Sequence, residues 1–387
     1  MRNICVVTGT RAEFGLMYWL INALHLDKDV NLQLVVTGMH LSPEFGLTYQ
    51  HIQEAGFKIT KKVETLLSSD TPVGISKSMG LAQISFAEVF QELQPDLLVV
   101  LGDRFEIFAV VSAAMICRVP VAHLHGGEAT EGLIDEPIRH SITKMSQLHF
   151  TATETYRQRV IQLGEQPNRV FNVGTPGLDN IYKLDLLSKE EFEKSIDFEL
   201  GEKNVLVTYH PVTLELNTAE QQFTELLKVL AEIDCKIIFT KPNADTEGRV
   251  IISLIDDFVA KHSAKSCSFI SLGQLRYLSA LQYMDAVVGN SSSGLTEAPS
   301  FKIATINVGD RQKGRIKSDS VIDCLPNYNS IHKAFKLAYS DAFKEKLKTV
   351  ENAYGKGGAS EKIKDTIKSV DLKGILKKSF YDIKSQS

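Results

Sequence analysis

Residues 120–144 run Pro120-Val-Ala-His-Leu-His-Gly-Gly-Glu-Ala-Thr-Glu-Gly-Leu-Ile-Asp-Glu-Pro-Ile-Arg-His-Ser-Ile-Thr-Lys144. The apolar run at 119–124 predicts a buried strand, and the two glycines after it let the backbone approach a ligand closely. Open α/β sheets bind ligands at the carboxyl ends of parallel strands, so the histidines and carboxylates here predict a site. A helix is expected to begin near Asp135, whose carboxylate suits an N-cap, with Arg139 one turn on. The alternative is that Asp135 and Glu136 only cap the helix and Arg139 pairs with them.

Outward from this stretch, short β-branched runs alternate with longer amphipathic runs, which predicts parallel strands joined by helices. A polar stretch at 187–203 interrupts the alternation, which then restarts. We therefore expect an α/β protein with two doubly wound Rossmann-like domains facing a cleft. The expected domains are 1–174, 175–358 and a C-terminal helical segment, 359–387. Strands are expected at 3–8, 32–37, 97–101, 119–124, 148–152, 170–173, 205–209, 236–240, 268–271, 286–289 and 304–308.

Composition narrows the class of protein. The chain has 387 residues, 43% hydrophobic and 23% charged, which is typical of a globular protein with more than one domain. A net charge of -4 argues against a general nucleic-acid binder, so an anionic ligand must be met locally. The five cysteines lack a C-x-x-C spacing, which favours buried reduced thiols over a metal site or disulfides. There is no long apolar segment and no signal-peptide pattern, so we expect a cytoplasmic protein without a membrane span.

Three strand ends of the first half carry candidate site residues. The turn at 9–15 opens a helix, and Arg11 there would add a charge-assisted contact to an anion; a plain tight turn is the alternative. His40 follows the second strand, although a lone histidine is more often structural. Asp103 and Arg104 follow the strand at 97–101 and could hold a sugar hydroxyl and a phosphate, or else form a helix cap with an ion pair.

In the second half, the strongest signal is the run of small hydroxyl residues at 290–294. Such residues at a helix start expose several donors to a phosphate oxygen, though a serine-rich cap without ligand is also possible. A histidine fixed by a following proline could donate to a diphosphate, and a glutamate one turn into the helix could accept ribose hydroxyls. The basic loop at 309–315 is either a mobile ligand loop or a solvated surface loop. The candidates are His210, Asn243, Ser271, Ser291, Ser292, Ser293, Gly294, Glu297 and Arg311.

As an ordered set, these motifs resemble the UDP-N-acetylglucosamine 2-epimerases. The motifs are Gly-Thr-Arg-Ala-Glu at 9–13, Leu-Gly-Asp-Arg at 101–104, His-Leu-His-Gly-Gly-Glu at 123–128, Asp-Glu-Pro-Ile-Arg-His at 135–140, Thr-Tyr-His-Pro at 208–211 and Asn-Ser-Ser-Ser-Gly at 290–294. The continuation to Lys144 resembles the hydrolysing, sialic-acid-pathway branch. The resemblance implies a glycosyltransferase-B-like fold whose C-terminal helix returns to the first domain. It also implies that UDP-N-acetylglucosamine and water give N-acetylmannosamine and UDP through elimination to a 2-acetamidoglucal and hydration.

The resemblance also implies roles for residues. The first domain would carry the catalytic groups Asp103, His125 and Asp135, with Arg104 and Arg139 as supporting cations. The second would bind UDP, using His210, Ser291, Ser292, Glu297 and Arg311 together with Arg11, and placing Tyr277 near the uracil. Two departures stand out. His125 replaces a usual glutamate, so either His125 transfers the proton or Glu128 takes that role, and Leu16 stands where some relatives have a lysine.

The expected partners follow from this resemblance. They are a UDP-sugar substrate and UDP as product, without cofactor, metal, nucleic acid or membrane, in a homodimer or homotetramer. Four alternatives stay open: a hydrolysing 2-epimerase of a UDP- or GDP-linked diacetamido-trideoxy sugar, a non-hydrolysing epimerase, a UDP-sugar glycosyltransferase, and a noncatalytic nucleotide-sugar sensor.

Overall fold

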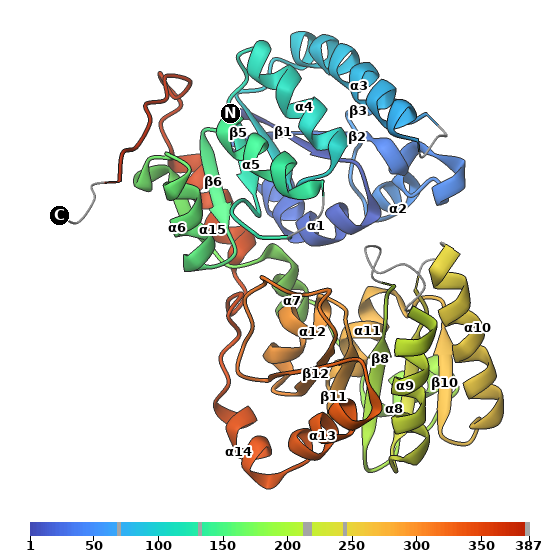
Figure 1. Ribbon diagram of the computed structural model, residues 1–387. Coiled ribbons are helices and arrows are strands. Elements are labelled where there is room, and N and C mark those ends of the chain that lie inside the picture. Colours follow the sequence, from blue (N-terminus) through green and yellow to red (C-terminus); the bar gives the residue numbers. More distant parts are fainter. Residues whose placement is uncertain (68–70, 131–133, 212–218, 243–245, 384–387) are drawn as a thin grey trace. The chain divides into compact units, whose positions relative to one another are not determined.

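The computed structural model describes residues 1–67, 71–130, 134–211, 219–242 and 246–383. These residues form two compact units, each with its own sheet (Figure 1). The first unit comprises residues 1–180 and 354–387, and the second comprises residues 181–353.

The first unit is built on a seven-stranded sheet in the described residues, with the strand order β3-β2-β1-β4-β5-β6-β7. Every pairing is parallel. The strands are β1 (Arg2–Thr8), β2 (Val30–Thr37), β3 (Lys61–Val63), β4 (Leu97–Leu101), β5 (Val121–Leu124), β6 (Leu148–Thr151) and β7 (Val170–Asn172). The helices are α1 (Arg11–Leu26), α2 (Tyr49–Glu54), α3 (Pro72–Leu93), α4 (Phe105–Ile116), α5 (Asp135–Met145), α6 (Glu154–Gln162) and α15 (Ala359–Ser369), with short 3-10 turns η1 (Gly38–Leu41), η2 (Pro43–Phe45), η3 (Pro167–Arg169) and η4 (Pro176–Leu178).

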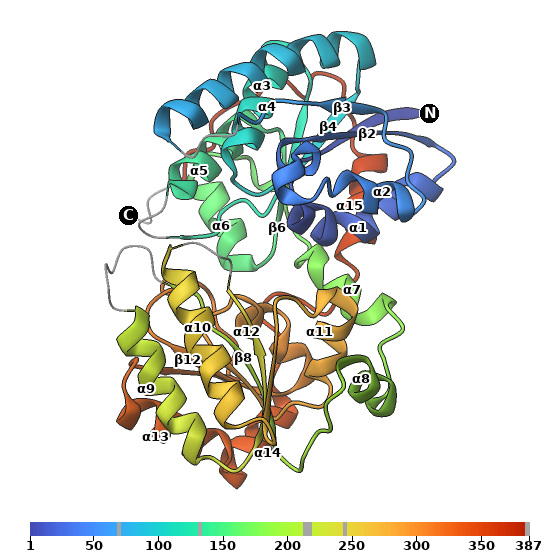
Figure 2. The same cartoon turned by 90° about the vertical axis from the view of Figure 1, so that its right-hand side faces the viewer.

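Alternating side chains of the strands build two cores, one on each face of this sheet. In β1, Ile4 and Val6 pack with α1 and α15, whereas Cys5 and Val7 pack with α3 and α4. The two helix layers are visible on opposite faces in Figure 2. Such burial on both faces explains why the strands are continuous apolar runs.

The C-terminal helix α15 docks on α1. Its first turn is capped by Asp179, whose carboxylate accepts from the backbone N-H groups of Gly358 at 2.5 Å, Ala359 at 3.2 Å and Ser360 at 2.8 Å. Its last turn is held by Lys368, which pairs with Asp27 at 2.8 Å. The helix α7 (Asp179–Lys183), which supplies this cap, contains the boundary between the units.

The second unit repeats the architecture with a six-stranded parallel sheet in the order β10-β9-β8-β11-β12-β13. The strands are β8 (Asn204–Thr208), β9 (Lys236–Thr240), β10 (Ser266–Phe269), β11 (Ala286–Gly289), β12 (Ala304–Val308) and β13 (Val321–Cys324). The helices are α8 (Lys189–Ile196), α9 (Ala219–Glu232), α10 (Thr246–Lys261), α11 (Gly273–Leu281), α12 (Ser293–Thr296), α13 (Tyr328–Ala338) and α14 (Asp341–Thr349), with the 3-10 turn η5 (Ala298–Phe301).

The expected α/β fold with doubly wound parallel sheets is confirmed in each unit, and several details are corrected. The polar stretch at 187–203 contains α8, which begins at a complete capping box between Ser188 and Glu191. The strand expected at 268–271 lies at 266–269, and β3 and β13 were not expected. Asp135 is the first residue of α5 and its side chain does not cap it, because Ile134 holds the N-cap position.

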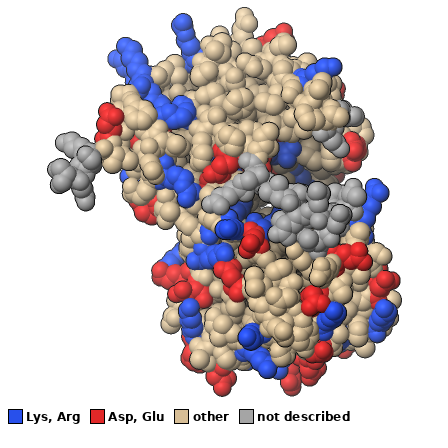
Figure 3. Space-filling view, in the orientation of Figure 1, with Lys and Arg blue, Asp and Glu red and all other residues tan. Residues whose placement is uncertain are grey.

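Surface and cysteine features agree with an ordinary globular chain. Positive and negative side chains are interspersed over the face shown in Figure 3. The five cysteines are unpaired, as expected, and are buried or half-buried. In the described part of the chain, none of the helices combines the length and apolar character that crossing a bilayer requires.

Candidate functional site

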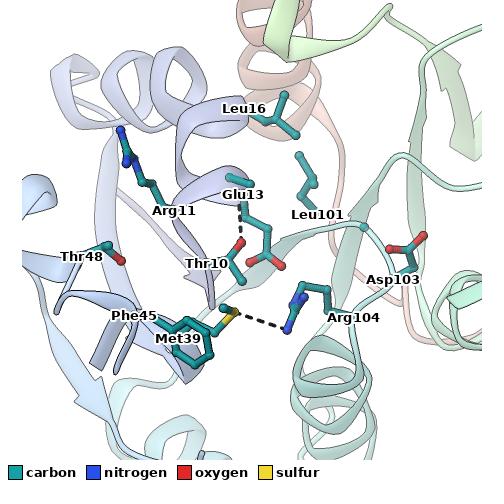
Figure 4. A pocket seen from close by; sticks show the side chains of 12 residues that line it. Thr10, Arg11, Glu13, Leu16, Met39, Phe45, Thr48, Leu101, Asp103 and Arg104 are labelled. Atoms are coloured by element: carbon teal, nitrogen blue, oxygen red, sulfur yellow. Dashed lines mark hydrogen bonds between the residues drawn. The ribbon is translucent and has the colours of Figure 1, made fainter. Parts of the chain in front are cut away.

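A cavity of about 460 Å³ opens at the carboxyl ends of β1 and β4 in the first unit. The strand order reverses between these two neighbours, so the chain leaves them in opposite directions and a crevice forms between the loops. Figure 4 shows Glu13 and Arg104 near its middle. The lining residues are Thr10, Arg11, Ala12, Glu13, Leu16, Met39, Phe45, Thr48, Leu101, Gly102, Asp103 and Arg104.

Next to this cavity, Arg139 organises the acidic groups. Its side chain is only 2% exposed, and its Nη2 pairs with the carboxylate of Asp103. Nη1 donates to Glu136 at 2.8 Å and to the backbone oxygen of Glu128 at 2.8 Å, and Nη2 also donates to the hydroxyl of Thr130 at 2.9 Å. Burial alone would lower the pKa of Arg139, but the neighbouring carboxylates, Asp103 first, outweigh it and raise that pKa. Arg139 is thus a fixed cation that sets the position of Asp103.

His125 and Glu128 form a direct pair. Nδ1 of His125 lies 2.9 Å from Oε1 of Glu128, and Nε2 lies 3.1 Å from the hydroxyl of Thr175. The backbone of His125 has φ +67°, a conformation that non-glycine residues rarely adopt and that is often found at functional sites. Gly127 follows at φ +79°, where a Cβ would come within 2.4 Å of the Tyr156 carbonyl oxygen. The sequence left His125 and Glu128 as alternatives, and the geometry makes them one unit.

The two acidic residues that start α5 have pKa values shifted in opposite directions. Partial burial, and then the charge of Asp103, raises the pKa of Asp135. Burial opposes ionisation of Glu136 too, but the backbone N-H of Thr130 and the charge of Arg139 outweigh it and lower the pKa of Glu136. A raised pKa favours the protonated form of a carboxyl group, and a lowered pKa favours the carboxylate. Asp135 is the better proton donor of the two.

Beneath the cavity, Glu13 and Glu106 are both buried at the carboxyl ends of β1 and β4. Glu13 Oε2 accepts from the backbone N-H of Gly9 at 2.7 Å, and Glu106 Oε1 accepts from Nε of Arg104 at 2.5 Å. Among the described residues, the other oxygen of each carboxyl group has no hydrogen-bond partner. Burial, and to a lesser degree the charge of Glu106, raises the pKa of Glu13 to about 8, although Gly9 and Arg104 act in the opposite direction.

This buried carboxyl group predicts a pH-dependent stability. Because the pKa of Glu13 is raised in the folded protein, its contribution to stability is complete below about pH 4.5 and is lost as the pH rises through about 8. We expect Glu13→Gln, which stays neutral, to melt roughly 5 °C higher than the wild type at pH 9 but not at pH 4.5. Thermal unfolding followed by circular dichroism at both values tests this. An equal difference at the two values would contradict the assignment.

Two histidines near the cavity lie in the protein interior. His40 is fully buried, its Nε2 is 3.1 Å from the Thr8 hydroxyl and its Nδ1 is 2.8 Å from the Thr48 hydroxyl. These contacts tie η1 to β1, and the substrate contact expected for His40 stays a prediction. His123 is also fully buried, with Nε2 2.8 Å from the Gly102 carbonyl oxygen. Burial lowers the pKa of His40 to about 4 and that of His123 to about 3, so both are neutral at pH 7.

In the second unit, the equivalent reversal of strand order lies between β8 and β11. Gly289 ends β11 at φ +128°, where a Cβ would come within 2.0 Å of the Thr208 carbonyl oxygen, so only glycine lets the two strand ends approach. The buried Asn290 then clamps the backbone of His210, accepting from its N-H at 2.7 Å and donating to its carbonyl oxygen at 2.8 Å. Arg311 donates to the carbonyl oxygen of Asn290 at 3.0 Å. His210, the serine run and Arg311 are thereby brought together at one sheet edge.

Of the remaining expected residues of this unit, some lie at the serine run and others lie away from it or outside the described residues. The hydroxyl of Tyr277 donates to that of Ser293 at 2.7 Å, so Tyr277 lies at the serine run. Gly294 packs against Thr305, where a Cβ would come within 2.6 Å of a methyl group. The helix expected after the serines is the single turn α12, which Glu297 ends. Ser271 is exposed just beyond β10, and Asn243 lies outside the described residues.

Four residues that touch the candidate groups were not chosen from the sequence. Glu136 was named only in the alternative of a helix cap, and Glu13 lies inside the Gly-Thr-Arg-Ala-Glu motif without a role. Glu106 and Thr175 carried no signal, because their importance comes from burial and from contacts with Arg104 and His125. Within the described ranges, no three His, Cys, Asp or Glu side chains are gathered as metal ligands.

Comparison with known proteins supports the sequence motifs. A family model described as UDP-N-acetylglucosamine 2-epimerase matches residues 22–368. The GDP/UDP-N,N'-diacetylbacillosamine 2-epimerase (hydrolyzing) of Campylobacter jejuni is 44% identical, covering 99% of both chains. The polysialic acid biosynthesis protein P7 of Escherichia coli is 40% identical, covering 99% of this chain and 98% of that one. The UDP-N,N'-diacetylbacillosamine 2-epimerase (hydrolyzing) of Legionella pneumophila is 36% identical, covering 96% and 97%.

A solved structure gives the corresponding fold. The UDP-GlcNAc 2-epimerase of Neisseria meningitidis, bound to UDP-GlcNAc, superposes with a TM-score of 0.81 over 96% of this chain and 100% of that one, at 19% identity. This likeness agrees with the glycosyltransferase-B-like fold class that the motifs implied.

Proposed function

The chain belongs to the UDP-N-acetylglucosamine 2-epimerase family, and from that premise we propose that it is a hydrolysing 2-epimerase of a UDP- or GDP-linked N,N'-diacetylbacillosamine. The observation that carries the choice of sugar is the 44% identity, over nearly the whole chain, to a relative with that printed activity. UDP-N-acetylglucosamine, the substrate expected from the sequence motifs, is the second candidate. UDP-N-acetylglucosamine remains a candidate substrate because the P7 protein, named for polysialic acid biosynthesis, is 40% identical to this chain.

The chemistry requires proton handling on both faces of C2. A base removes the C2 proton, the electron pair forms the C1-C2 double bond, and the C1-O pair leaves with the nucleotide diphosphate. Water then adds its oxygen to C1 of the 2-acetamidoglycal while a proton reaches the opposite face of C2. The first unit offers two separate proton-carrying groups, the Asp103 and Asp135 carboxyls beside Arg139 and the His125–Glu128 pair. We assign one group to each face.

The leaving diphosphate needs fixed donors. In this proposal the second unit binds the nucleotide, with His210, Ser291, Ser292 and Arg311 meeting the negative charge that grows as the C1-O bond breaks. The clamp from Asn290 supports this role because it fixes the backbone at His210 before substrate arrives. Arg11, exposed at the first turn of α1, is the first unit's candidate cation for an anionic group of the substrate.

Proton NMR in heavy water tests the reaction directly. Incubation with UDP-N,N'-diacetylbacillosamine should give free sugar and UDP, with deuterium at C2 of the epimerised product. GDP-N,N'-diacetylbacillosamine and UDP-GlcNAc should be compared in parallel. Deuterium is expected because the new C2 hydrogen comes from solvent. An epimer that keeps its nucleotide would instead mean a non-hydrolysing enzyme, and transfer that requires an added acceptor would mean a glycosyltransferase.

A further inference from the structure

The surface of the cavity beside Asp103 is mostly apolar. Figure 4 shows Leu16 and Leu101 toward one end and Met39 and Phe45 toward the other. Phe45 is 41% exposed although it lines a cavity, which leaves an aromatic face uncovered by the protein. Cavities that are apolar with a few placed polar groups are typical of ligand sites.

The apolar walls are held in place by the surrounding structure. Leu16 lies against Gly177, where a Cβ would come within 2.5 Å of its Cδ2. The sulfur of Met39 lies 3.7 Å from Nη2 of Arg104, and His40 anchors the turn that carries Met39. A wall fixed before binding loses little entropy when it meets a ligand, so it can discriminate between similar sugars.

Three charged groups of the cavity already have protein partners, although among the described residues the second oxygen of Glu13 has none. Glu13 accepts from Gly9, Arg104 donates to Glu106, and Asp103 pairs with Arg139. A hexose with hydroxyl groups at C4 and C6 would need new partners for both when it is buried here, at a cost if they are not found. A sugar with a methyl group at C5 has no C6 hydroxyl to satisfy, and its acetamide methyl at C4 presents carbon to the same walls, so that only the amide group at C4 needs partners.

We propose that Leu16, Met39, Phe45 and Leu101 form the specificity pocket for the 4-acetamido and 6-deoxy carbons of the substrate sugar. The inference rests on the proposed function, because it takes Asp103 as a group that acts at C2. C4 and C6 are a ring's width from C2, so a cavity that adjoins Asp103 is within their reach.

The test compares kcat/KM for UDP-N,N'-diacetylbacillosamine and UDP-GlcNAc in the wild type, Leu16→Asn and Phe45→Ser. The wild type should prefer the diacetamido sugar. Each variant should reduce this preference at least about tenfold, since contacts of one or two carbons in apolar pockets are worth about 10- to 200-fold. Leu26→Asn is the matched control, because Leu26 lies on the same helix and is 69% exposed. It should leave the preference unchanged.

The possible outcomes separate the two proposals. If the wild type hydrolyses neither substrate, the proposed function fails. If it prefers the diacetamido sugar and folded Leu16→Asn and Phe45→Ser keep that preference, the function stands and the pocket assignment is overturned. If the wild type prefers UDP-GlcNAc, the pocket assignment is also overturned, while hydrolytic epimerisation itself stands. Melting temperatures within a few degrees of wild type show that the variants are folded, and Phe45→Ser is the safer one because its ring is already exposed.

Discussion

Asp103→Asn should lower kcat by about 10³-fold while UDP binding stays within about twofold of wild type. The asparagine keeps the shape of the side chain and can still contact Arg139, but it cannot accept a proton. General acid-base catalysis by one positioned group contributes roughly 10²- to 10⁴-fold, which sets the expected size of the loss. Steady-state kinetics on the preferred nucleotide sugar and calorimetric titration with UDP measure the two quantities.

Glu136→Gln is the matched control, because it alters the other carboxylate that Arg139 contacts. If the role of Asp103 were only to neutralise Arg139, both variants would lose activity to the same extent. We expect Glu136→Gln to lower kcat less than about tenfold. In the wild type the pKa of Glu136 is lowered and its carboxylate accepts from the backbone N-H of Thr130, so Glu136 is a poor proton donor. Near-normal turnover by Asp103→Asn, or equal losses in the two variants, would remove Asp103 from the proton-transfer step.

The sequence predicts the strands of both sheets because buried parallel strands are continuous apolar runs. It misses β3 and β13, which are short edge strands of three and four residues with charged side chains. It also misses α8, although Ser188 and Glu191 carry a capping-box signal, because few apolar residues follow. The capping of α15 by Asp179 lies beyond any local pattern, since the two segments are about 180 residues apart.

The candidate site is predicted in outline for a similar reason. Strand ends meet at one edge of a parallel sheet, so residues such as Asp103 and His125 can be chosen without knowing their contacts. The direction in which each side chain points, and how deeply it is buried, cannot be predicted from the sequence pattern. His40 follows a strand like the others, yet its ring is enclosed between two hydroxyl groups. Conversely, the importance of Glu106 comes from its contact with Arg104, and no sequence spacing predicts that contact.

The contact between His125 and Glu128 leads to the second large effect, a double-mutant cycle that is strongly non-additive. His125→Asn and Glu128→Gln should each lower kcat about 100-fold, and the double variant should lose little more than the worse single variant. The reason is that a proton carried by the pair requires both members: Glu128 sits 2.9 Å from Nδ1 and orients the ring, and the ring in turn meets Thr175. Asparagine is chosen because, like histidine, it tolerates the positive φ of this position.

The cycle is read from the kcat of the four proteins, with circular dichroism confirming that each is folded. Thr175→Val serves as the comparison, since it removes the hydroxyl at Nε2 but leaves Glu128 in place; it should lower kcat less. Multiplicative losses, about 10⁴-fold in the double variant, would instead mean that His125 and Glu128 act independently and do not carry the proton as a pair.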